Sequence, residues 1–208
     1  MYWVHRFGHG PRRRTFQYFL DVSAMYYLLK EKHCLTVGWL GFSDTTSNDY
    51  NPDIVNAVET GNPDQVMKLM LDAGKNWTPP IDSGWANSLV YFTKMQPGDI
   101  VVVLPNKDCV PYFFVAEIKS AAKSILKSPS NMTSPFKVSG VDFSFSSSSG
   151  WTRNEDVLDV GFFHEVELLT KELPRDLIGG MFNSYRRTNS PINDVSKQQY
   201  IDSLISKP

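Results

Sequence analysis

The sequence predicts an α+β fold in which short, mostly antiparallel strands form a partly closed β-barrel with flanking helices. Three observations predict this fold class. Runs rich in β-branched and aromatic residues recur along the chain, segments with helical spacing of apolar residues lie between them, and Gly, Pro and Asn mark the boundaries. Short strands with interspersed helices are typical of small α+β barrels.

Residues 85–119 are expected to form the centre of the fold. A helix is expected over about 87–95, because an apolar residue recurs about once per turn until Pro97 and Gly98 end the pattern. The apolar runs 100–104 and 112–118 then predict a β-hairpin. Both runs are hydrophobic at consecutive positions, which indicates strands that are covered on both faces.

The elements expected before this centre follow from the same two periodicities. They are a strand at 2–7, a helix at 16–30, a strand at 34–38, and two short helices at 54–59 and 65–73. Asn51 and Asn62 are the expected N-caps of the two short helices, since each precedes a Pro and an Asp. We therefore expect the two short helices to precede the central helix in the chain.

After the hairpin the chain becomes rich in Ser, and structure then returns. The later elements expected are strands at 136–138, 141–145 and 157–169 and a terminal amphipathic helix at 194–205. We expect one domain, with a core at 1–122, a Ser-rich insert or loop at 123–150, and a C-terminal strand and helix at 151–208 that complete it.

Composition limits the classes of function. The chain of 208 residues has 21 basic and 22 acidic residues and a formal net charge of −1, so no global field draws it to nucleic acid. Any nucleic-acid contact must come from local basic clusters. Because no apolar run reaches bilayer-spanning length and the start is not a signal peptide, we expect a cytoplasmic protein without a membrane partner. The two Cys residues are not spaced as metal ligands, and they are too few to form a disulfide framework.

Five short motifs carry a resemblance to a known group of domains. In chain order they are Tyr2–Arg6, Leu35–Asp44, Met95–Val103, Gly161–Glu167 and Arg186–Asn189. Together they resemble the N-terminal module of some Mrr-like, type IV restriction endonucleases, which is similar to the PUA-like group that includes EVE and YTH domains. The resemblance covers most of the chain, although the insert from Thr45 to Ile81 and the Ser-rich region differ from compact EVE domains.

The resemblance implies a non-catalytic reader. Such a PUA-like barrel takes a modified or flipped base into an aromatic pocket, while basic loops hold the phosphate backbone. It implies DNA as the partner, a role in restriction or defence, no cofactor, and a nuclease that is either a separate partner or a domain outside this chain.

A base pocket needs flat apolar rings and a few fixed polar groups, and stacking on an aromatic ring contributes about 1–3 kcal/mol per base. Most of the candidate rings are expected to fill the core. The candidates are Trp3, Trp39, Phe42, Trp77, Trp85 and Phe114. The residues expected to form the pocket are Trp39, Phe42, Ser43, Asp44, Trp85 and Asn87. A helix cap is the alternative role for Asn87.

The phosphate-binding residues expected from the basic clusters are Arg12, Arg13, Arg14, Tyr185, Arg186 and Arg187. Residues 185–189 are expected to form a polar loop. The N-terminal cluster would extend the same footprint if the first strand pairs near this C-terminal segment. Solvated loops are the alternative meaning of both clusters.

A catalytic interpretation competes with the reader. Asp99, Glu117 and Lys119 match the residue types of PD-(D/E)xK nucleases, in which two carboxylates hold Mg²⁺ and the Lys assists the attacking water. A hairpin brings the start of its first strand beside the end of its second, so the spacing permits such a site. A third possibility is an interaction scaffold that binds a protein through helices at 54–73.

Overall fold

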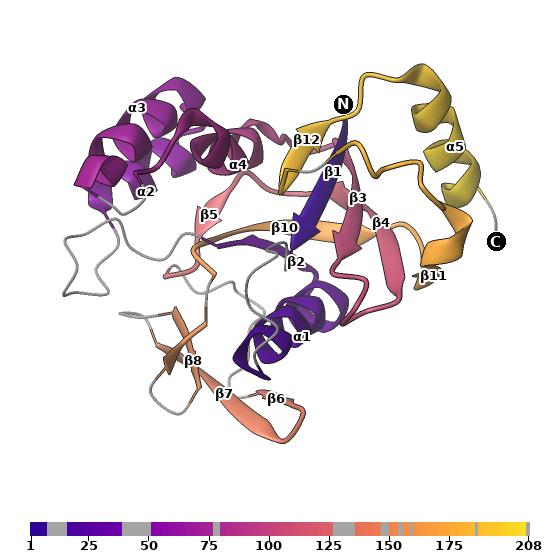
Figure 1. The fold of residues 1–208 in the computed structure, drawn as a ribbon, viewed down its shortest axis with the longest axis horizontal. Helices are drawn as coiled ribbons and strands as arrows, with labels where there is room; N and C mark the ends of the chain where they lie inside the picture. The colour runs from indigo at the N-terminus through magenta and orange to yellow at the C-terminus, as the bar shows by residue number, and fades with distance from the viewer. Residues whose placement is uncertain are drawn as a thin grey trace.

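The structure is a computed structural model that describes residues 1–7, 16–38, 51–76, 80–126, 136–146, 150–153, 156–158, 160–185 and 187–206. The expected α+β class is confirmed. A curled mixed sheet forms half of a barrel, with helices packed around it (Figure 1). Among the helices of the described ranges, none is both long and apolar enough to cross a membrane.

The main sheet has eight strands within the described chain, and its central path runs β12-β1-β3-β4-β10-β2. These strands are β1 (Tyr2–Phe7), β2 (Cys34–Val37), β3 (Ile100–Pro105), β4 (Tyr112–Ile118), β5 (Lys123–Ser124), β10 (Phe162–Leu168), β11 (Leu173–Pro174) and β12 (Asn189–Pro191). Neighbouring strands are antiparallel except for β1 and β3, which are parallel. The mostly antiparallel pairing and the β3–β4 hairpin are as expected.

The helices begin where short-range capping places them. They are α1 (Phe16–Lys32), α2 (Pro52–Glu59), α3 (Pro63–Ala73), α4 (Ser83–Lys94) and α5 (Val195–Ile205). Asn51 and Asn62 cap α2 and α3 as expected, since each side chain accepts backbone N–H bonds from the first turn. Asp82 caps α4 through the Trp85 amide at 2.8 Å, so α4 begins before the expected 87 and Asn87 is not a cap.

A smaller sheet lies beside α1 and occupies part of the Ser-rich region (Figure 1). It comprises β6 (Phe136–Val138), β7 (Val141–Ser146), β8 (Gly150–Arg153) and β9 (Asp156–Val157). Phe136 stacks on Tyr27 of α1 at 4.5 Å and on Phe143 at 4.9 Å, and its ring meets the edge of Trp151. An aromatic core therefore joins this sheet to α1.

Two apolar clusters cover the two faces of the main sheet. Trp3 and Val101 face a cluster with α1 to α4, whereas Val4 and Val102 face a second cluster with α5 and the segment around Phe182. The consecutive hydrophobic residues of β3 and β4 are thus buried on both faces, as their pattern predicts. Figure 1 shows α5 and the group of α2, α3 and α4 on opposite sides of the strands.

A buried polar connection ties β1, β12 and α4 together. His5 donates from Nδ1 to Asn189 Oδ1 at 2.6 Å, and Asn189 donates from Nδ2 to the Ser88 carbonyl at 2.7 Å. Asn189 is fully buried as the first residue of β12, which corrects the expectation of a polar loop through 185–189. The local sequence is polar, but pairing with β1 buries its last residue.

Replacing Asn189 with Ala leaves the His5 Nδ1–H buried without its partner, whereas the Ser88 carbonyl lies within α4 and keeps its helical hydrogen bond. We expect the free energy of unfolding to fall by roughly 1–3 kcal/mol, the cost of one unsatisfied buried group. Urea denaturation measures this change. Ser190→Ala, in the same strand, is the control and should change stability by less than about 0.5 kcal/mol. Equal effects of the two substitutions would contradict the buried connection.

The buried His5 makes stability depend on pH. Burial is the main cause that lowers the pKa of His5 from 6.5 to about 4, so the unfolded chain binds the proton first as the pH falls. Between these two values, protonation favours the unfolded state. Stability should therefore fall by about 1.4 kcal/mol per pH unit below pH 6.5.

Urea denaturation at pH 7, 6 and 5 tests this dependence. His5→Gln should show a shallower slope across the same interval, whatever its stability at pH 7. A wild-type protein that is equally stable at pH 5 and pH 7 would contradict the prediction.

Candidate nucleic-acid interface

Four cationic residues belong to, or contact, the segment that connects β11 to β12. We call residues 175–187 the basic segment, and it begins with a single 3₁₀ turn at Arg175–Leu177. Arg175 and Arg187 belong to this segment, Arg6 reaches it from β1, and Lys197 reaches it from α5. Arg186 lies outside the described residues.

Arg6 is held against the basic segment by side chain and backbone. Its Nη2 donates to the Phe182 carbonyl at 2.5 Å, and its amide donates to the Thr188 carbonyl at 2.6 Å. Only 8% of the residue is exposed, and burial lowers the pKa of its guanidinium. The β1–β12 pairing that the sequence analysis required is therefore present. Arg12 to Arg14 lie outside the described residues.

Arg175 is fixed by its backbone at the start of the segment. Its amide donates to the Pro111 carbonyl at 3.0 Å, and its carbonyl accepts the Ile178 amide at 3.2 Å. The side chain is half-buried, and its Nη1 is a buried donor without a hydrogen-bond partner. Burial first, and then the charge of Arg6, lower the pKa of Arg175 to about 10. Both causes disfavour the charged form of Arg175.

Tyr185 supports a cation on its ring. Lys197 Nζ lies over the ring at 4.9 Å from the centroid, and Phe182 packs against it at 5.9 Å. Lys197 also lies 3.4 Å from the Asp194 carboxylate at the start of α5. Tyr185 is therefore half-buried beneath a charge, while Arg187 is exposed. Both are residues that the sequence analysis assigned to phosphate binding.

Trp85 lies in the first turn of α4, and 51% of it is exposed. The buried residues of α4 belong to the first apolar cluster, whereas Phe182 of the basic segment belongs to the second, on the other face of the sheet. The described link between α4 and the end of the segment is the bond from Asn189 to the carbonyl of Ser88, one turn after Trp85.

The expected base pocket is only partly described. Asn87 is half-buried on α4, two residues after Trp85. Trp39, Phe42, Ser43 and Asp44 lie outside the described residues. Trp3 and Phe114, two further rings of the aromatic set, are buried at 3% and 2% exposure and fill the core, as most rings of that set were expected to do.

The structure does not bring the three candidate nuclease residues together. Ile100 pairs with Glu117, so the alternation of side chains sends Asp99 and Glu117 to opposite faces of the hairpin. Asp99 accepts bonds from the Trp3 indole at 2.8 Å and from the Met1 amino group at 2.6 Å. Lys119 instead bridges Glu117 at 2.9 Å and Glu167 at 2.7 Å on the surface. Within the described ranges, no group of three or more His, Cys, Asp or Glu is placed to hold a metal ion.

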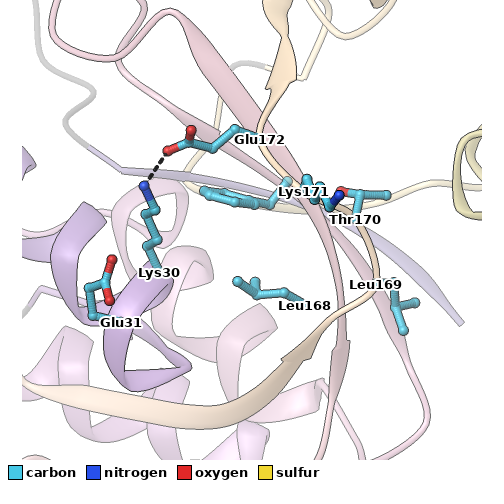
Figure 2. Close-up of a pocket in the computed structure, with 8 residues that line it drawn as sticks. Lys30, Glu31, Leu168, Leu169, Thr170, Lys171 and Glu172 are labelled. Atoms are coloured by element: carbon cyan, nitrogen blue, oxygen red, sulfur yellow. Dashed lines mark ion pairs between the residues drawn. The ribbon is translucent and has the colours of Figure 1, made fainter. Parts of the chain in front are cut away.

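An open cleft of about 640 Å³ lies between the end of α1 and the turn that links β10 to β11. Lys30 pairs with Glu172 across it at 2.9 Å (Figure 2). Tyr26 donates to the same carboxylate. Its lining holds Lys30 and Lys171 against Glu31 and Glu172. These charges balance, so the cleft does not select an anion by its electrostatics.

Three of the four cations at the basic segment were missed by the sequence analysis. Arg6 and Arg175 stand alone among neutral or mixed neighbours, and Lys197 is one charge on an amphipathic helix. No local pattern distinguishes them from solvated charges. Only the pairing of β1 with β12 and the docking of α5 bring them to one place.

The chain was also compared with known proteins. No protein-family model, no curated protein and no solved structure matched it.

Proposed function

We propose that this protein is a non-catalytic, PUA/EVE-like nucleic-acid reader that recognises a modified base in DNA within a restriction or defence system. The observation that carries the proposal is that Arg6 and Lys197 contact the basic segment, which itself carries Arg175 and Arg187. The curled half-barrel sheet supports the comparison with PUA-like folds at the level of architecture. DNA cleavage, in this proposal, belongs to another domain or partner.

Local charge supports phosphate contact despite the net charge of −1. The basic segment and the side chains that reach it include two acidic groups, Asp176 within the segment and Asp194 beside Lys197. Four cations therefore exceed two anions at this place. Guanidinium and ammonium groups hold phosphate oxygens with little dependence on sequence, and the binding falls as salt rises. Such contacts position a duplex and leave recognition to the base pocket.

Trp85 supplies the aromatic part of the proposed interface. An exposed indole costs hydrophobic free energy in water, and a stacked base recovers part of it. It lies in the first turn of α4, one turn before Ser88, whose carbonyl bonds to Asn189, two residues after Arg187. Asp99 and Glu117 face opposite sides of the hairpin, so we do not carry the nuclease alternative further.

Removing single cations tests phosphate contact. We expect Arg187→Gln and Lys197→Gln each to weaken binding of a fluorescent DNA duplex and to reduce the slope of log K against log salt by about 1, because each neutralises one phosphate. Fluorescence anisotropy from 50 to 200 mM salt measures both quantities. Lys137→Gln, whose Lys pairs with Asp142 on the small sheet, is the matched control.

The same titrations can overturn the proposal. Absence of wild-type binding at low salt, with modified and unmodified duplexes alike, would remove its basis. An equal loss in Lys137→Gln would show that general charge, and not this segment, drives the binding.

Removing the indole tests base stacking. Trp85→Ala should weaken binding of DNA that carries the recognised base by about 1–3 kcal/mol, the contribution of one stacked base. Trp85→Phe should restore part of the affinity, since it keeps a ring. Undiminished binding by the Ala variant would exclude Trp85 from the pocket.

A further inference from the structure

Arg175 is held in an environment that its own chain does not complete. The guanidinium is half-buried, forms no ion pair with a described carboxylate, and has a buried Nη1 without a hydrogen-bond partner. Its backbone has no freedom to withdraw, because the amide bonds to Pro111 and the carbonyl closes the 3₁₀ turn. A buried donor left unsatisfied is costly, so a feature of this kind calls for a partner outside the protein.

Arg6 makes this environment more positive. Its side chain is directed to the Phe182 carbonyl within the same segment, and its charge acts on Arg175. Two cations that share a partly desolvated region repel one another. An anion bound between them would relieve the repulsion and satisfy the open donor at once. The geometry therefore favours a compact anion with several acceptor oxygens.

We propose that Arg175, together with Arg6, binds one phosphate group. Phosphate offers oxygens in several directions and a charge that one or two guanidinium forks match. Arg175 is half-buried, so part of its side chain is accessible from solvent. The inference rests on the proposed function for the source of the phosphate, a DNA backbone, and on Arg175 for the site itself.

Thermal unfolding in matched ionic strength tests the site with inorganic phosphate as the probe. The wild-type melting temperature should rise with phosphate relative to chloride, because a ligand that binds only the folded state stabilises it. Arg175→Gln should lose this rise. In chloride alone the same variant should be as stable as the wild type or more stable, because it removes a repelled cation.

Two further variants keep the test independent of folding. Arg175→Lys retains the charge without the fork and should keep a reduced phosphate response. Lys137→Gln, which changes a surface cation on the small sheet, should keep the full response to inorganic phosphate. A structural role for Arg175 would instead give destabilised variants with an unchanged phosphate response, and that result would overturn the proposal. So would a wild type that does not respond to phosphate.

Duplex binding separates the sources of phosphate and the two proposals. Arg175→Gln should weaken duplex binding at least about tenfold, the change expected on losing one charge-assisted hydrogen bond. If wild-type protein binds phosphate through Arg175 but no duplex at low salt, the proposed function fails and the site stands with free phosphate as its ligand. If duplex binding is undiminished in Arg175→Gln and phosphate has no effect, the site fails and the proposed function remains.

Discussion

The N-terminal strand lies between β3 and β12, and the rest of the structure depends on this placement. β1 pairs in parallel with β3 over six residues and antiparallel with β12, which is nearly the whole chain away in sequence. By lying between β3 and β12, β1 makes the sheet continuous, and the sheet separates the two apolar clusters. Because β-strand side chains alternate, Trp3 and His5 enter one cluster while Val4 and Arg6 face the other.

Burial of polar and charged side chains affects both the stability of the fold and the charges at the candidate site. His5 is buried as a neutral group that bonds to Asn189, so the core tolerates it at neutral pH. Arg6 and Arg175 differ, because guanidinium groups stay charged and burial brings their repulsion into a region with little water. The fold holds both groups in place through backbone bonds to Thr188 and Pro111. Strain of this electrostatic kind, maintained by the surrounding structure, is a common property of binding sites.

Much of the fold could be predicted because its elements are encoded locally, whereas the candidate site could be predicted only in part. Asn51 and Asn62 predict where α2 and α3 begin, because both are N-cap residues. The continuous apolar runs of β3 and β4 predict that these strands are buried on both faces of the sheet. Asn189 shows the limit, since a polar residue in a polar stretch became a fully buried strand residue. Tyr185 and Arg187 were anticipated because they cluster in sequence, while Arg6, Arg175 and Lys197 were not.

The sequence by itself determined where helices begin, which runs form strands and which surfaces are apolar, because capping, turn geometry and side-chain alternation act over a few neighbouring residues. Only the tertiary structure decided which strands pair, which polar groups are buried and which cations meet. Those outcomes depend on the packing of segments up to about 180 residues apart, such as His5 with Asn189. Desolvation and charge repulsion are properties of that packing, and no local stretch of the chain contains them.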